Sequence, residues 1–179
     1  VQYFDKKILV PFGEFLPFRK NLKFMESIAG NFDFQIGKMD RILTTKDNTK
    51  ILPVICYEII FDQILKDINK KQIDVLINIT NDSWFGNKVG PYQHFYITRI
   101  KSVIANKPII RVSNNGISGI FDYNGKIIKY SKLNQEDNFQ HNLKIINTIS
   151  FHLIHKYLFY YIGFLFLIFF AFSQFKKDE

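Results

Sequence analysis

The stretch IDVLINIT, residues 73–80, is a continuous run of mostly β-branched apolar residues. Such runs are typical of strands that are buried on both faces, as in parallel sheets. Two further apolar runs flank it, ILPVICYEIIF at 51–61 and PIIRVS at 108–113, and RILTT at 41–45 predicts a shorter strand. The chain therefore carries at least three further strand signals around one central buried strand.

Helices predicted over 61–71 and 92–106 alternate with these strands. After PIIRVS, the segment ISGIFDYNGKIIKYS at 117–131 predicts an antiparallel hairpin with Asn124 and Gly125 at its tip. Strands that alternate with helices and end in a hairpin indicate an α/β layered domain with a mixed sheet.

The composition narrows the classes of partner and site. The chain has 179 residues, a net charge of +8, one cysteine and four histidines. The lysines are spread along the sequence and no RNA-binding motif is present, so we expect no nucleic-acid partner, while contact with anionic lipid headgroups stays open. The histidines have no zinc-like spacing, so we expect neither a metal nor a cofactor.

Residues 157–175 differ from the rest because they carry no charge and lie between Lys156 and Lys176. As a helix they would extend about 28 Å, close to the hydrocarbon thickness of a bilayer. The alternative is a buried amphipathic helix, but the apolar residues of this helix are distributed around all of its sides. The sequence predicts a domain over 1–150 and a transmembrane helix with a short basic tail over 151–179, and the positive-inside rule puts that tail in the cytoplasm.

Cys56 lies at the end of the apolar part of ILPVICYEIIF. A free cysteine is most often a small buried hydrophobe, and that interpretation stays open. Two features favour a nucleophile: a strand would deliver Cys56 to the edge of the sheet, and a fully buried strand would avoid the following Glu58. If the strand turns here, the N–H groups of Tyr57 and Glu58 could face an oxyanion. A nearby cation would favour the reactive thiolate. The candidates for this cation are Lys6, Lys7 and His94.

Four segments carry a resemblance to a known family. They are FDKKILVPFGEFLPF at 4–18, ICYEIIF at 55–61, NITNDSWFGNKVGPYQHF at 78–95 and RVSNNGISGIFDYNGKI at 111–127. In this order and spacing they resemble segments of the bacterial apolipoprotein N-acyltransferases, which belong to the carbon–nitrogen hydrolase (nitrilase) superfamily. The resemblance covers nearly the whole chain.

The resemblance implies part of an α-β-β-α sandwich, followed by one C-terminal transmembrane helix. It places the catalytic nucleophile at Cys56, the catalytic lysine at Lys6 and a second essential glutamate at Glu14. The residues it implies on the substrate side are Tyr57, Glu58 and Trp84. For Trp84 the alternative is a side chain that holds its loop against the core. The aromatic-rich segment 15–40 has two interpretations, a lipid-contacting arm and a surface loop.

The implied reaction is a two-step acyl transfer at the bacterial inner membrane, with the main domain on the periplasmic side. The Cys56 thiolate attacks a phospholipid ester, and the amine of a diacylated apolipoprotein then takes the acyl chain from the thioester. The family's general-base glutamate lies well before the lysine, and this chain has only five residues before Lys6. A separate N-terminal fragment is therefore an expected partner. The alternatives are an inactive remnant or split-enzyme fragment, and another nitrilase-superfamily amidase.

Overall fold

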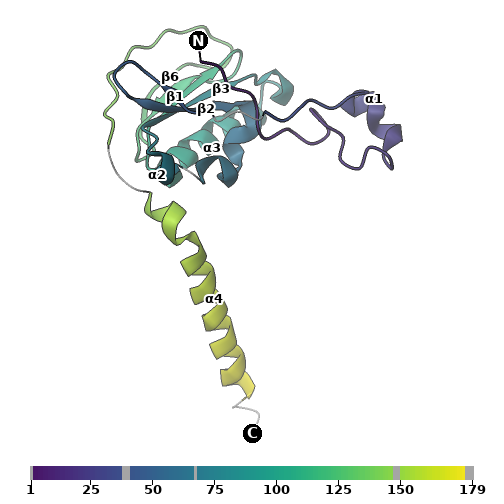
Figure 1. The fold of residues 1–179 in the computed structure, drawn as a ribbon, viewed down its shortest axis with the longest axis vertical. Helices are drawn as coiled ribbons and strands as arrows, with labels where there is room; N and C mark the ends of the chain where they lie inside the picture. The colour runs from purple at the N-terminus through teal and green to yellow at the C-terminus, as the bar shows by residue number, and fades with distance from the viewer. Residues whose placement is uncertain (1, 38–40, 67, 147–149, 176–179) are drawn as a thin grey trace.

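The computed structural model describes residues 2–37, 41–66, 68–146 and 150–175, apart from the side chains of 28–29, 151–154, 156 and 171–175. Six strands form one sheet in the order β1-β2-β3-β4-β5-β6 (Figure 1). They are β1 (Leu43–Thr44), β2 (Lys50–Ile55), β3 (Val75–Thr80), β4 (Ile109–Ser113), β5 (Gly119–Phe121) and β6 (Ile127–Tyr130). Strands β2, β3 and β4 run parallel, and every other pairing is antiparallel. The predicted α/β architecture with a mixed sheet is confirmed.

The helices vary widely in length. The α-helices are α1 (Glu26–Ala29), α2 (Ile68–Lys71), α3 (Val89–Ala105) and α4 (Phe151–Phe175), and the 3₁₀ helices are η1 (Lys23–Met25), η2 (Cys56–Ile60), η3 (Asp62–Leu65) and η4 (Ser83–Phe85). The single helix predicted over 61–71 is wrong. Phe61 is extended, with ψ 126°, and the described residues after it form the two short helices η3 and α2. These bury Leu65 and Ile68 separately.

One face of the sheet carries the core. Helices α2 and α3 lie on this face (Figure 1), where Leu52, Val54, Leu76 and Ile109 from three strands pack with Phe95 of α3. Because side chains alternate along a strand, the neighbouring residues point to the opposite face.

On that opposite face, Ile55, Ile79 and Val112 lie in register across three strands. Ile79 and Val112 are each 49% exposed. Within the described part of the chain, this opposite face of the run IDVLINIT is buried at Val75 and half exposed at Ile79.

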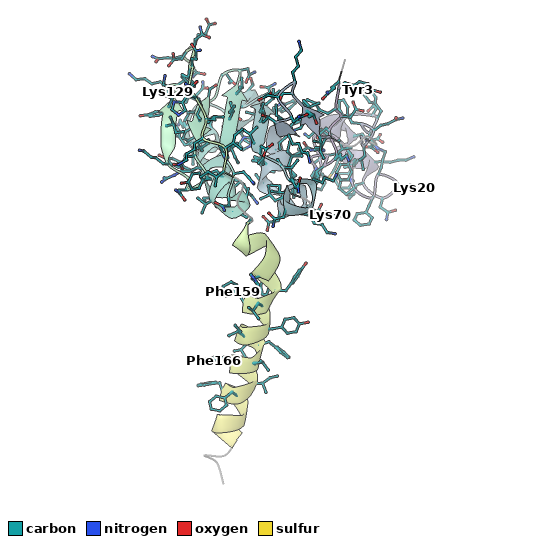
Figure 2. The ribbon with its side chains drawn as sticks, turned by 60° about the vertical axis from the view of Figure 1, so that its left-hand side comes forward. Tyr3, Lys20, Lys70, Lys129, Phe159 and Phe166 are labelled. Carbon is teal, nitrogen blue, oxygen red and sulfur yellow. The ribbon has the colours of Figure 1, made fainter. Side chains whose placement is uncertain are left out.

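Helix α4 projects away from the sheet and its helices (Figure 1). Phe159 and Phe166 stand out from it (Figure 2), and the large apolar side chains of residues 157–170 are all at least 38% exposed. No helix within the described residues is long and apolar enough to cross a membrane. The predicted transmembrane helix is not found there, and the predicted tail at 176–179 lies outside the described residues.

The segment before β1 forms an arm that extends sideways from the sheet and carries α1 (Figure 1). Arg19 holds it together, because its guanidinium binds Glu26 at 3.1 Å and Asp33 at 2.5 Å. Phe18 and Phe24 lie on this arm and are 80% and 77% exposed. The arm thus exposes apolar rings to solvent, while its own ion pairs hold its backbone together.

Candidate active site

Cys56 lies on a tight turn at the carboxyl end of the parallel strand β2. It is the first residue of η2, and its φ of 53° is in the left-handed region, which costs a residue with a Cβ roughly 1–2 kcal/mol. Its side chain is half-buried, and the Sγ atom donates to the carbonyl of Asn81 at 3.8 Å. The strand thus turns at Cys56, and Cys56 is not part of the buried apolar cluster.

Lys6 and Glu14, predicted as catalytic residues, are in direct contact. The Lys6 Nζ atom lies 2.6 and 2.7 Å from the two Glu14 carboxylate oxygens. Glu14 also accepts the backbone N–H of Val10 at 2.8 Å, which closes the turn between them. Among the described residues, no hydrogen bond joins Lys6 to Cys56.

Glu58 provides the link between these two parts of the site. Its Oε1 accepts the backbone N–H groups of Lys7 and Ile8 at 2.7 and 2.8 Å. Its Oε2 accepts the N–H of Ile55 at 2.8 Å. The same carboxylate therefore binds the residue after Lys6 and the residue before Cys56.

Glu58 is fully buried, and Arg41 binds both of its oxygens at 2.8 Å. Both oxygens of Glu58 therefore accept N–H groups of the protein. The substrate-side role of Glu58 stays a prediction. Sequence reasoning also missed Arg41, whose partner is 17 residues away.

Tyr57 and Trp84 occupy different surroundings. The Tyr57 ring lies 5.9 Å from the ring of Phe85 and 5.8 Å from that of His94, centroid to centroid. Trp84 belongs to η4 and is 83% exposed. Trp84 therefore does not hold its loop against the core, and its contact with a substrate stays a prediction.

A buried polar cluster lies beneath the Cys56 turn and consists of Asn78, Asp82, His94 and Arg111. Asp82 binds His94 Nδ1 at 2.9 Å and Arg111 Nη2 at 2.6 Å. Burial would raise the pKa of Asp82, but the hydrogen bond from His94 and the charge and hydrogen bond of Arg111 together lower it to about 2. The carboxylate is therefore ionised at neutral pH.

His94 was one candidate for the cation beside the thiol. Burial lowers the pKa of His94, and its interaction with Asp82 only partly opposes this. The ring is therefore neutral at pH 7, with the Nδ1 proton facing the Asp82 carboxylate. Sequence reasoning gave no role to Asn78, Asp82 or Arg111. The available signal was a polar residue between apolar neighbours in each of two mostly apolar runs, Asn78 in IDVLINIT and Arg111 in PIIRVS.

No group of three or more His, Cys, Asp or Glu side chains that could hold a metal ion occurs among the described residues. The chemistry that this arrangement supports is nucleophilic, because Glu58 connects the turn that carries the cysteine to the segment that carries the lysine–glutamate pair.

Comparison with known proteins places this chain in a family. Residues 4–154 match the carbon–nitrogen hydrolase family. The chain is 46% identical over 132 residues to the apolipoprotein N-acyltransferase of Rickettsia typhi and 38% identical over 138 residues to that of Rhizobium rhizogenes, covering 74% of this chain in both cases. It spans only 26% and 25% of the length of these two relatives.

Solved structures show the same fold. A glutamine-dependent NAD+ synthetase from Acinetobacter baumannii superposes with a TM-score of 0.56 at 19% identity, over 75% of this chain and 24% of that one. Nit3 of Saccharomyces cerevisiae, a nitrilase-superfamily member, gives 0.50 at 21% identity, over 63% and 42%. The six-stranded sheet is thus part of a nitrilase-like fold. The chain belongs to the carbon–nitrogen hydrolase family and is similar to a part of the apolipoprotein N-acyltransferases.

Proposed function

We propose that Cys56 is the nucleophile of an acyltransferase that moves an acyl chain from a phospholipid to the N-terminal cysteine amine of an apolipoprotein. The observation that carries this proposal is the Glu58 carboxylate, which binds the N–H groups of both Lys7 and Ile55. It connects the segment that carries Lys6 to the Cys56 turn. Because the Glu58 side chain is fully buried, these contacts are not those of a surface loop.

In the proposed chemistry, the Cys56 thiolate attacks the ester carbonyl and lysophospholipid leaves. The acyl-thioester then passes its acyl group to the amine, so one difficult step becomes two easier ones. The Lys6 ammonium stabilises the negative charge that develops on the carbonyl oxygen, and Glu14 holds that ammonium in place. The exposed Trp84 contacts the acyl chain or the headgroup.

The proposed place of action is the bacterial inner membrane, with the sheet on the periplasmic side. The exposed rings of Phe159 and Phe166 on α4 support contact with lipid. Flotation with phosphatidylethanolamine–phosphatidylglycerol vesicles tests this part of the proposal. The Phe159→Glu, Phe166→Glu double variant should float less than the parent, whereas Tyr130→Glu, at a ring 60% exposed on β6, should not.

We also propose that the working enzyme includes a further layer of chain over the face formed by Ile79 and Val112. The half exposure of these two side chains supports this, because apolar sheet faces are normally covered. The same layer would supply the general base, which typically contributes about 10² to 10⁴-fold to the rate.

Trapping of the acyl-enzyme tests the function. The chain is mixed with phospholipid micelles, and mass spectrometry is used to find an acyl adduct on Cys56 that hydroxylamine removes. Cys56→Ala is the matched control, and the remaining segments of a full-length relative are supplied in a second reaction.

An adduct in either reaction supports the proposal, and an adduct only in the second identifies a split enzyme. No adduct in either reaction would overturn the proposal in favour of an inactive remnant. Reaction with small amides but not with phospholipid would favour an amidase.

A further inference from the structure

A continuous chain of buried hydrogen bonds connects Arg111 to the backbone of Cys56. Asn78 and Arg111 are register partners on β3 and β4, and Arg111 Nη1 donates to Asn78 Oδ1 at 2.7 Å. The Asn78 amide nitrogen then donates to the carbonyls of Val54 and Cys56 at 3.2 and 3.1 Å. Asn78 therefore uses both amide hydrogens on the two carbonyls at the end of β2.

Arg111 is itself held firmly. It is fully buried, and a buried guanidinium is tolerated only when it is paired and hydrogen-bonded. Its four acceptors are Asp82 Oδ2 at 2.6 Å, Asn78 Oδ1 at 2.7 Å, the Ile117 carbonyl at 3.1 Å and Thr98 Oγ at 3.3 Å. The Arg111 guanidinium fixes the orientation of the Asn78 amide, because the amide oxygen must face this cation.

The direction of the Cys56 carbonyl determines the direction of the next N–H. The peptide bond between Cys56 and Tyr57 is trans, so its C=O and N–H point in opposite directions. With the carbonyl held inward by Asn78, the N–H of Tyr57 points outward from the core. It also lies in the first turn of η2, where N–H groups have no partner within the helix.

We propose that Asn78, oriented by Arg111 and Asp82, is a positioning residue that aims the Tyr57 N–H at the oxyanion formed when Cys56 attacks a carbonyl. This inference rests on the proposed function only in taking Cys56 as the nucleophile. Removal of an oxyanion donor typically slows acyl transfer about 10²- to 10³-fold. A donor that is merely misdirected should therefore cost acyl transfer about tenfold or more.

Two reagents separate this role from a general structural one. Acylation by p-nitrophenyl butyrate passes through an oxyanion: the C–S bond forms, the C–O bond breaks, p-nitrophenolate leaves and the thiol proton goes to solvent. Alkylation by iodoacetamide is a direct displacement at carbon without an oxyanion. Because Cys56 is the only cysteine, both rates report on one atom. The ratio of acylation to alkylation then isolates the oxyanion contribution.

The decisive variant is Asn78→Asp, which keeps an oxygen facing Arg111 but removes both N–H donors to the carbonyls. The matched control is Asn69→Asp on α2, which makes the same change at an amide that donates to the Ser150 carbonyl at 3.3 Å. We expect the ratio to fall about tenfold or more in Asn78→Asp and to stay unchanged in Asn69→Asp.

An unchanged ratio in a folded Asn78→Asp, whether neither rate falls or both fall equally, would overturn the inference. If circular dichroism shows that this variant does not fold, Asp82→Asn replaces it, since it removes the charge that holds Arg111. A smaller fall of the same ratio is expected there, and no fall overturns the inference. If the acylation-to-alkylation ratio falls as expected in Asn78→Asp but phospholipid never acylates Cys56, only the proposed function is contradicted.

Discussion

The Arg41 guanidinium and the Glu58 carboxylate face each other through two N–H···O hydrogen bonds of 2.8 Å, with side chains 7% and 0% exposed. The Arg41 cation thus compensates the negative charge of Glu58, which is buried under the Cys56 turn. The remaining hydrogen-bonding capacity of Glu58 binds backbone N–H groups from two distant segments. Loss of Arg41 would therefore affect both the stability of the protein and the position of Lys6.

Arg41→Ala should lower the free energy of unfolding by about 3–5 kcal/mol, because it leaves the buried Glu58 carboxylate without its countercharge. Urea denaturation measures this change. Trypsin cleavage at Lys6 and Lys7 should also become faster, because the backbone of Lys7 and Ile8 is then held less firmly by Glu58. Arg19→Ala is the control, since its ion pairs are on the surface arm and should change stability far less. Equal effects of the two substitutions would contradict the assigned role of Arg41.

Acid should destabilise the protein through Asp82. Its pKa is lowered in the folded state to about 2 from 3.8, so its contribution is complete above about pH 4 and is lost as the pH falls from 4 to 2. The shift corresponds to about 2 kcal/mol. The lowered pKa of His94 acts in the same direction but near its ordinary value of 6.5.

Urea midpoints from pH 7 to pH 2 separate the two groups. In Asp82→Asn the loss of stability between pH 4 and pH 2 should shrink. A variant with an undiminished loss in that range would show that other carboxyl groups cause it.

Replacement of Cys56 should show the strain in its backbone. Cys56→Gly should be more stable than Cys56→Ala by about 1 kcal/mol, because glycine adopts a φ of 53° without a steric cost. Thermal denaturation of both variants gives the difference. At Val112, in the extended strand β4, the order of the glycine and alanine variants should reverse. The same order at both positions would argue against strain at Cys56.

Gly116 leaves room for the buried cluster. A Cβ atom there would collide with Asp82 Oδ2 and lie 2.5 Å from Ser113 Oγ. Gly116→Ala should therefore destabilise the protein by about 1–3 kcal/mol and lower the acylation-to-alkylation ratio of Cys56. Gly163→Ala on α4 is the control, because a Cβ there meets nothing within 4 Å. A Gly116→Ala protein with parental stability would show that the cluster can shift.

Trp84 should matter for substrate and not for folding. Because its side chain is 83% exposed, Trp84→Ala should change the free energy of unfolding by less than about 0.5 kcal/mol. Acyl-adduct formation from phospholipid should fall about tenfold, the equivalent of roughly 1.4 kcal/mol of lost contact. Alkylation of Cys56 by iodoacetamide should stay constant. A parallel loss of alkylation would mean that Trp84 supports the turn itself.

Several features of the fold could be predicted from local patterns. The apolar runs around residues 51–55, 75–80 and 109–113 correspond to the three parallel strands, and the Asn124-Gly125 signal corresponds to the turn between β5 and β6. The helix at 61–71 could not be predicted reliably, because two separate short turns give the same local spacing of apolar residues. The membrane span expected at 157–175 is not found among the described residues.

The sequence by itself determined the order of the strands along the chain and the position of Cys56 at a strand end, because both depend on residues within about a dozen positions. Only the tertiary structure decided that Glu58 pairs with Arg41, that Asn78 receives Arg111 from 33 residues away, and that Ile79 lies on an open face. The physical reason is strand register, because a slip of one residue would exchange the two faces of the sheet. In addition, no local sequence pattern specifies which distant charged side chain pairs with a buried one.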